Sequence, residues 1–374
     1  MSLINHLISD SELASYGLNA AQSDDNARVA ALYRQQLDSQ SGWPRLIGNM
    51  QKYSRIRRCT LDVRSIPIGL MLNETRAPSL TAQTFERKAA PPASQPCHLC
   101  ELEPRQKAVL ALDGQYLLLI NPGVTMPGDL TIASVYHRPQ LITGFFGDMI
   151  ALSQSLSDYS IFYNGAMAGA SIPHFHFQAG QKDTLPAEEQ IQKLLDGFPV
   201  GQAHLVELYN SPVGAVYGVQ DFLRATYLIR SKETTELERL FLIFYDNLLE
   251  VDAEIFKIPN VPDFGSYIEV MGMHESEPRM NLMLKYDPPS GEYLLAVFPK
   301  VSNRPAVYFK HGSEQIIVGM AIKESLGNLI CCRRSDYHKL RQSGELVAEL
   351  YRDTSISERL TDQLNRRLAR LDSV

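Results

Sequence analysis

Gly169-Ala-Ser-Ile-Pro-His-Phe-His-Phe-Gln-Ala-Gly180 is the segment of this chain that is most informative about its fold. In an extended strand, successive side chains point to opposite faces. His174, His176 and Gln178 would then line one face, while Phe175 and Phe177 anchor the other face in a core. A neutral imidazole can attack phosphorus, and a neighbouring amide can hold the phosphoryl oxygens of a covalent intermediate. The pattern therefore favours phosphate chemistry over the alternative, a half-buried strand that happens to carry two histidines.

Composition restricts the class of protein. The chain has 374 residues, of which 44% are hydrophobic and 21% charged, as expected for a globular protein with one large or two medium domains. A net charge of −6 argues against a nucleic-acid partner. No apolar run approaches the roughly 20 residues that cross a bilayer, and the N-terminus lacks the features of a signal peptide. We therefore expect a cytoplasmic protein without a membrane partner, and the five cysteines do not indicate a secreted disulfide framework.

Apolar periodicity predicts an α+β fold built from antiparallel strands. In the first half, helices are expected at 26–40, ending or redirected at Trp43-Pro44, and at 139–156, with β structure at 55–72, 116–120, 130–135, 158–165 and in the histidine segment. In the second half, we expect strands at 205–209, 225–229, 280–286, 293–298 and 316–318, and helices after Pro186, at 233–251 and at 356–371.

The order of these elements suggests two similar halves, although no sequence repeat is evident. We expect an N-terminal helical segment at 1–60, a catalytic domain with a metal site at 61–200, and a second α+β half at 201–374.

Cys97-His-Leu-Cys100 has the spacing of a redox pair or of a metal-binding pair. Metal is favoured because the pair follows a proline-rich loop, whereas a redox dithiol usually opens a helix directly after a strand. Zinc takes four ligands, and His137 and His174 are the natural candidates to complete a closed, structural site. His98, between the cysteines, is expected to be exposed. The residues themselves leave zinc and iron open.

The segment Gly169-x-Ser171-x-Pro173-His174-x-His176-x-Gln178 resembles the active-site signature of galactose-1-phosphate uridylyltransferase, in the histidine-triad superfamily. The order Cys97, Cys100, His137, His174 follows the zinc ligands of that transferase. The segments at 121–132 and 137–140 are similar to the strand pair that precedes the histidines in triad proteins, and Leu72-Asn73-x-x-Arg76 is similar to an N-terminal segment of the transferase. The similarity covers residues 60–180 and implies a histidine-triad-like fold, which we expect as two tandem halves, with structural zinc and no organic cofactor.

The resemblance also implies roles for individual residues. His176 would be the nucleophile that forms a nucleotidyl-histidine, and Gln178 would support the phosphoryl group. Ser171 and the backbone from Gly169 onward would bind phosphate oxygens, Asn164 would contact the nucleotide, and His174 would bind zinc. Triad hydrolases carry a third histidine at the position of Gln178, and an amide cannot act as an acid or a base, so transfer to a phosphate is favoured over hydrolysis.

Two departures from the pattern bear on the substrate. Asn164 and Gly165 are adjacent, whereas the transferase has an intervening residue, and Phe175 and Phe177 replace small residues. Both departures favour a nucleotide phosphorylase branch over the sugar transferase.

Any such enzyme must neutralise substrate phosphates, and Arg76, Lys300 and Arg304 are our candidates, against the alternative of ordinary surface charges. The leading hypothesis is a nucleotidyltransferase or phosphorylase acting on an NDP-sugar or a dinucleotide. The alternatives are a nucleotide phosphoester hydrolase and a non-catalytic nucleotide-binding protein. Active sites in the family that it resembles often share loops across a subunit interface, so a homodimer is one expected state.

Overall fold

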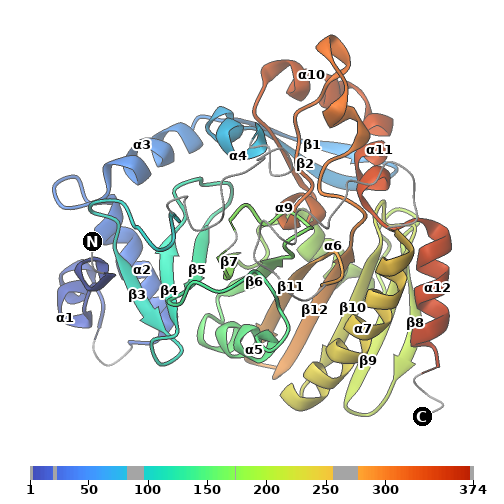
Figure 1. Cartoon of the computed structure of the whole chain (residues 1–374), viewed down its shortest axis with the longest axis horizontal. Coiled ribbons are helices and arrows are strands. Elements are labelled where there is room, and N and C mark those ends of the chain that lie inside the picture. The colour runs from blue at the N-terminus through green and yellow to red at the C-terminus, as the bar shows by residue number, and fades with distance from the viewer. Residues whose placement is uncertain (1–2, 20–22, 82–96, 173, 256–276, 371–374) are drawn as a thin grey trace.

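The computed structural model describes residues 3–19, 23–81, 97–172, 174–255 and 277–370 (Figure 1). It contains a ten-stranded antiparallel sheet and a separate three-stranded sheet. The strands of the large sheet, in spatial order, are β3 (Ala108–Ala111), β4 (Tyr116–Ile120), β5 (Leu130–Ser134), β7 (His176–Gln181), β6 (Tyr159–Asn164), β11 (Met280–Asp287), β12 (Glu292–Pro299), β10 (Thr226–Ser231), β9 (Gly214–Gln220) and β8 (His204–Asn210). The strands of the small sheet are β1 (Arg57–Val63), β2 (Ile66–Leu72) and β13 (Asn328–Cys331).

The large sheet consists of two halves with the same strand order. Each half has three consecutive antiparallel strands, a crossing helix, and two further strands of which the later one lies beside the third strand. The crossing helices are α5 (Phe146–Ser155) and α7 (Thr234–Ile255). The halves join where β6 pairs with β11. The expected α+β fold with two tandem halves is thus confirmed.

The halves differ in how their last two strands connect. A long connection joins β6, which ends at Asn164, to β7, which begins at His176, whereas residues 288–291 form the tight turn between β11 and β12. Because β6 and β11 are antiparallel, these two connections lie at opposite ends of the sheet. Only the first half therefore carries the long loop that precedes the histidine strand.

Helices and the small sheet cover the two faces of the large sheet. We call the side that carries His176, Gln178, Phe162 and Met283 the His176 face. The small sheet packs against this face together with α6 (Pro186–Leu195), α9 (Ile322–Ser325), α10 (Arg334–Gln342) and α11 (Gly344–Thr354).

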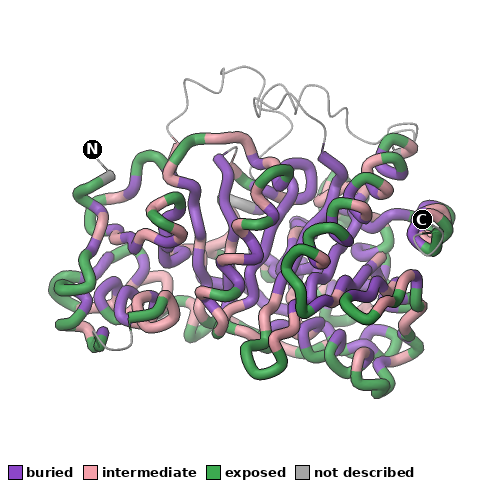
Figure 2. Tube along the Cα trace, turned by 90° about the horizontal axis from the view of Figure 1, so that it is seen from below, coloured by how far each residue is buried: buried purple, intermediate pink, exposed green. Residues whose placement is uncertain are grey.

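The opposite face, with Phe175 and Phe177, packs against α2 (Asp25–Leu37), α5, α7 and α12 (Glu358–Leu368). The remaining helices are α1 (Asp10–Leu13), α3 (Pro44–Tyr53), α4 (Ala77–Thr81) and the short 3-10 turns η1 (Leu3–His6), η2 (Ala14–Tyr16), η4 (Glu74–Arg76), η6 (Ala306–Phe309) and η7 (Gly312–Glu314). Buried backbone runs through the central strands, and exposed segments lie on the outer loops and helix surfaces (Figure 2). Within the described ranges, no helix is both long and apolar enough to cross a membrane.

Several expected elements differ from the structure. The strand expected at 316–318 is wrong: this segment is buried but forms no strand, and β13 begins at Asn328 instead. The helix expected from residue 139 begins only at Phe146. Pro44 does not simply end a helix but opens α3, because the first turn of a helix does not need the missing proline N–H. The final helix buries Leu360, Leu364 and Leu368, so it is part of the core.

Candidate functional site

The four candidate metal ligands meet at one point. The side-chain donor atoms of Cys97, Cys100, His137 and His174 all lie within 4.8 Å of one another. The Nδ1 atom of His174 is 3.3 Å from Cys97 Sγ and 3.4 Å from Cys100 Sγ, and His137 Nδ1 is 3.2 Å from Cys100 Sγ. Two thiols and two imidazoles are a donor set that zinc takes in closed tetrahedral sites, so the residues fit a structural metal.

The ring of His174 is oriented as in a metal ligand. Its Nε2–H donates to the carbonyl oxygen of Ser134 at 2.7 Å, which leaves the Nδ1 lone pair directed at the cysteines. Metal-bound histidines characteristically donate their second ring N–H to such an acceptor. Burial lowers the pKa of His174 to about 4, so the ring is neutral and able to coordinate at neutral pH. His98 is exposed, as expected.

His176 begins β7, on the side of the sheet that the small sheet covers. Its side chain is buried, and its Nδ1–H donates to the carbonyl oxygen of His174 at 2.8 Å. This hydrogen bond fixes the tautomer in which Nε2 carries the free lone pair. Burial also lowers the pKa of His176, which keeps the ring neutral. The structure thus presents an imidazole with a single available nitrogen, as a nucleophile requires.

Gln140 fixes the backbone of His176. Its side-chain oxygen accepts from the His176 N–H at 2.8 Å, and its side-chain nitrogen donates to the His176 carbonyl at 2.9 Å. The same nitrogen lies 3.1 Å from the carbonyl oxygen of Asn164. Gln140 is fully buried, and these hydrogen bonds hold the start of β7 beside the end of β6.

Gln178 lies two residues beyond His176 and therefore on the same face. It is half-buried and pairs in register with Thr131 on β5 and Phe162 on β6. The predicted side-by-side arrangement of imidazole and amide is present.

Residues 165–172 form a compact loop ahead of the histidine strand. The N–H of Gly165 donates to the Met280 carbonyl at 3.0 Å, and the N–H groups of Ala168 and Ala170 donate back to Gly165. Gly169 has a φ of +117°, and an added Cβ would lie 2.8 Å from the Cβ of Ala321. The loop is therefore packed directly against the residue that precedes α9. Ser171 is exposed at the end of the loop.

The side chain of Asn164 is engaged within the protein. Its oxygen accepts from Asn281 Nδ2 at 2.6 Å and from the N–H of Ile322 at 2.9 Å. Asn281 also donates to the Ala168 carbonyl at 2.9 Å. Asn164 and Asn281 thus tie the sheet, the loop and the start of α9 together.

The three cations expected from sequence gather around one buried carboxylate on α9. Burial raises the pKa of Glu324, and Arg76 is among the groups that oppose this. Burial lowers the pKa of Lys300 and of Arg304, and in both cases Glu324 opposes the shift. Arg76, Lys300 and Arg304 therefore all lie close enough to Glu324 to interact with its charge.

Lys323, also on α9, adds a fourth cation. Its Nζ donates to both oxygens of Asp129 at 2.7 Å and to Thr125 Oγ1 at 2.8 Å. The region thus holds four cations, Arg76, Lys300, Arg304 and Lys323, against two carboxylates, Asp129 and Glu324. This surplus of positive charge suits an anionic ligand.

Sequence reasoning missed Gln140, Asn281 and the Lys323–Asp129 pair. Gln140 stands in the segment 137–140 that carries the resemblance, and Asn281 is a lone amide in an apolar strand, so each left a weak signal. Nothing in the sequence links Lys323 to Asp129, because their contact depends on the tertiary fold.

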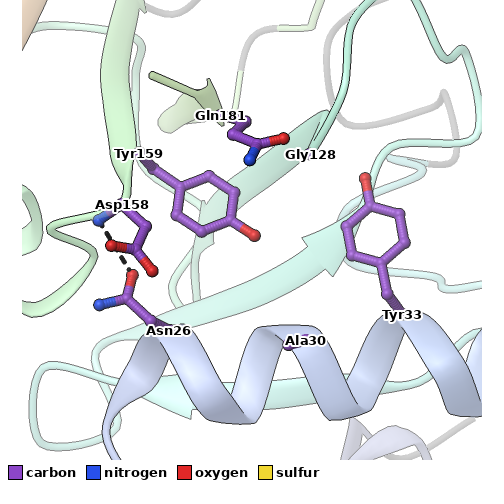
Figure 3. A pocket seen from close by; sticks show the side chains of 7 residues that line it. All are labelled: Asn26, Ala30, Tyr33, Gly128, Asp158, Tyr159 and Gln181. Carbon is purple, nitrogen blue, oxygen red and sulfur yellow. Dashed lines mark hydrogen bonds between the residues drawn. The ribbon is translucent and has the colours of Figure 1, made fainter. Parts of the chain in front are cut away.

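A small cavity of about 250 Å³ lies between α2 and the strand ends at Asp158, Tyr159 and Gln181. Figure 3 shows Tyr159 and Gln181 facing Tyr33 across it. None of the expected site residues line this cavity, so it is separate from the histidine site.

A family model described as a domain of unknown function, DUF4922, matches residues 32–181. A comparison with curated proteins found no match. Among solved structures, yeast Ap4A phosphorylase Apa2 aligns with a TM-score of 0.51 and 13% identity, over 83% of this chain and 95% of that one. The two chains share a fold.

Two further alignments are weaker. The same yeast enzyme in complex with AMP aligns with a TM-score of 0.49 and 13% identity, over 83% of this chain and 96% of that one. A DUF4931 family protein from Bacillus cereus ATCC 10987 aligns with a TM-score of 0.31 and 14% identity, over 58% of this chain and 97% of that one.

Proposed function

We propose that this chain is a nucleotidyltransferase of the phosphorylase type that works through a nucleotidyl-His176 intermediate. The observation that carries the proposal is the buried imidazole of His176, whose Nδ1–H is tied to the His174 carbonyl while Nε2 stays available. The Gln178 amide on the same face and the cation surplus around α9 support it. The fold shared with a phosphorylase that acts on a dinucleotide makes a dinucleoside polyphosphate the first substrate to test, with an NDP-sugar as the alternative.

The reaction would proceed in two displacements. In the first, Nε2 of His176 attacks the phosphorus of a nucleotidyl group, an N–P bond forms, and the P–O bond to the remaining phosphate chain breaks. In the second, an oxygen of a phosphate acceptor attacks the same phosphorus, and the N–P bond breaks to regenerate the neutral ring. Gln178 would hold the phosphoryl oxygens in both steps, and it supplies no base to activate water.

The surrounding residues would bind and orient the substrate. Backbone N–H groups from Gly169 onward and the Ser171 hydroxyl would contact phosphate oxygens, while Arg76, Lys300 and Arg304 would offset the charge of the phosphate chain. Asn164 would act mainly by holding the loop beside α9. We propose zinc at Cys97, Cys100, His137 and His174, where it would fix the position of His174 and hence of His176 two residues later.

Intact-protein mass spectrometry tests the proposal. The wild-type chain is incubated with diadenosine tetraphosphate, UDP-glucose, GDP-glucose or ADP-glucose and quenched at alkaline pH, where phosphohistidine persists. We expect one nucleoside monophosphate on the wild type, none on His176→Ala, and an unchanged adduct on His204→Ala, which removes an exposed histidine. An adduct that persists in His176→Ala would overturn the assignment of the nucleophile. Free monophosphate in the same tubes, without any acceptor, would instead indicate a hydrolase.

A further inference from the structure

Arg224 lies in the turn between β9 and β10, and it is buried between two aromatic rings. Its guanidinium carbon is 4.4 Å from the ring centre of Phe222 and 4.9 Å from that of Tyr351. The residue is only 6% exposed. The stacking leaves the in-plane edge of the guanidinium, which carries the N–H groups, as the part that can bind a partner.

That edge lacks an acceptor. Nε, Nη1 and Nη2 of Arg224 are all buried, and none has a hydrogen-bond partner in the part of the chain that the structure describes. Cation–π contacts with the rings compensate the charge only in part, because they satisfy no N–H donor. A buried cation with unsatisfied donors is strongly unfavourable, so the arrangement calls for an anion with several oxygens.

One further cation lies close to Arg224, although the wall of the cavity described below also carries Asp221, Asp353, Glu358 and Asp362. Lys300 is buried nearby, and its Nζ is 3.3 Å from Thr354 Oγ1. Burial lowers the pKa of Lys300 to about 7, with Glu324 opposing the shift and Arg224 adding to it. The two cations are therefore close enough to repel one another, which adds to the cost of leaving Arg224 without an anion.

Arg224 also lines a cavity of about 940 Å³, large enough for a nucleotide-sized ligand. Ser355 and Ser357 line the same cavity, and Ser357 caps the N-terminus of α12, which spans 11 residues. The N-terminal end of a helix favours negative charge, and in α12 Glu358 already stands in the first turn. Two other arginines of the cavity wall, Arg64 and Arg352, are already paired with Glu345.

This cavity is distinct from the histidine site. Strands β6, β11 and β12 separate β10 from β7. Four steps between neighbouring strands, each about 4.8 Å, place the start of β10 roughly 19 Å from His176.

We propose that Arg224 binds the phosphoryl group of a small phosphate-bearing molecule in this cavity, at a site separate from His176. The planar fork of the guanidinium fits two phosphate oxygens. The start of α12, in the wall of the same cavity, would flank the ligand. The phosphoryl group could come from free phosphate or pyrophosphate, or from a nucleotide, and the test below distinguishes these sources.

Thermal unfolding of the full chain tests the site, with inorganic phosphate, pyrophosphate or ATP titrated at constant ionic strength in chloride buffer. A ligand that binds only the folded state raises Tm with concentration. We expect this rise in the wild type and a clearly smaller rise in Arg224→Met, in which only binding at the proposed His176 site remains. In chloride alone, Arg224→Met should unfold at or above the wild-type Tm, because a buried unpaired charge has been removed. Arg224→Lys keeps the charge but not the planar fork. It should need about ten times more ligand than the wild type, or more, for the same rise in Tm.

Two variants serve as matched controls. Arg352→Met removes an exposed arginine of the same cavity wall, and His176→Ala removes the nucleophile; both should keep the response. A response to phosphate or pyrophosphate would identify a free anion as the ligand, and a response to ATP alone would identify a nucleotide. The proposal is overturned if no probe raises Tm, if Arg224→Met responds like the wild type, or if the response disappears in His176→Ala instead.

Discussion

At the scale of single residues, the environment of His176 restricts what the site can do. The Nδ1–H is held by the carbonyl of His174, two residues before it, and Gln140 holds both the N–H and the carbonyl of His176. The ring therefore cannot flip, or move its proton from Nδ1 to Nε2, without breaking a buried hydrogen bond. In the proposed mechanism, the neighbouring amide of Gln178 would favour a phosphate acceptor over water, since it can bind phosphoryl oxygens but cannot take a proton from water.

Replacing Gln178 by histidine should convert transfer into hydrolysis. The imidazole would supply a general base for water, an effect worth about 10²–10⁴ in rate. We expect the ratio of free monophosphate to transfer product to rise at least tenfold, measured by chromatography of products with phosphate present as the acceptor. Gln178→Asn keeps an amide and is the control: a comparable rise in hydrolysis there would mean that loss of positioning, and not the added base, is responsible.

Glu277 gives a prediction about pH. Its carboxylate accepts from the N–H of Ile142 at 2.8 Å and from the hydroxyl of Tyr163 at 2.9 Å, yet burial raises its pKa from 4.5 to about 7. Between those two pH values the folded state binds more protons than the unfolded state. The free energy of unfolding should therefore fall as pH rises from about 4.5 to about 7.

Glu277→Gln should remove this part of the pH dependence, because an amide does not titrate. Urea midpoints at pH 5 and pH 7.5 measure the effect, and exposed Glu349→Gln is the matched control. An equal decline with pH in wild type and Glu277→Gln would show that other groups cause it.

At the scale of elements, the cluster of Cys97, Cys100, His137 and His174 joins the segment ahead of β3 to the residues just before β7. Cys97→Ser should reduce bound zinc from about one equivalent to a small fraction and lower Tm by roughly 5–10 °C. Metal analysis and thermal unfolding measure both effects. Cys59→Ser, outside the cluster and half-buried, should change neither. A purified wild-type chain without zinc or iron would contradict the assignment of the ligands.

The loop at 165–172 depends on its glycine. Gly169→Ala should destabilise the fold by about 1–3 kcal/mol, because φ is +117° and the new Cβ would meet Ala321. Gly197→Ala is a useful control, since φ is +79° there and no atom lies within 4 Å of the added Cβ. Urea unfolding should show a larger loss for Gly169→Ala, together with lower adduct formation at His176. Equal losses in the two variants would mean that backbone strain alone, and not the contact with α9, is at work.

The strands next to His176 could be predicted from sequence because each has apolar alternation or an apolar run that ends at Gly, Pro or Asn. The same reasoning failed at 316–318, where the buried side chains Ile316 and Val318 belong to a segment held by hydrogen bonds that are not those of a strand.

The cation set around α9 could be predicted only in part. Arg76, Lys300 and Arg304 were within reach of sequence reasoning, whereas Lys323 and Arg224 derive their importance from burial, which the local sequence does not reveal.

At the scale of the whole molecule, the large sheet is made from two halves, of which only the first carries the proposed nucleophile. The order of elements along the chain indicates the two halves, whereas the amino-acid sequences of the halves show no evident repeat. Residues 288–291 replace the loop that in the first half precedes the histidine strand, and β12 carries no histidine. The second half supplies instead α9 and Lys300, which pack beside the site of the first half.

The small sheet that covers the His176 face has a consequence for biosynthesis. Its strands β2 and β13 pair Gly69 with Asn328, which are 259 residues apart in the chain. At a synthesis rate of about 5–20 residues per second, roughly 13–50 s pass between the emergence of the two partners from the ribosome. During that interval the backbone edge of β2 that later pairs with β13 has no partner. An unpaired strand edge can pair with another chain, so the nascent chain must protect it from aggregation. Premature release before β13 would therefore yield a chain whose histidine strand is complete but whose covering layer is missing.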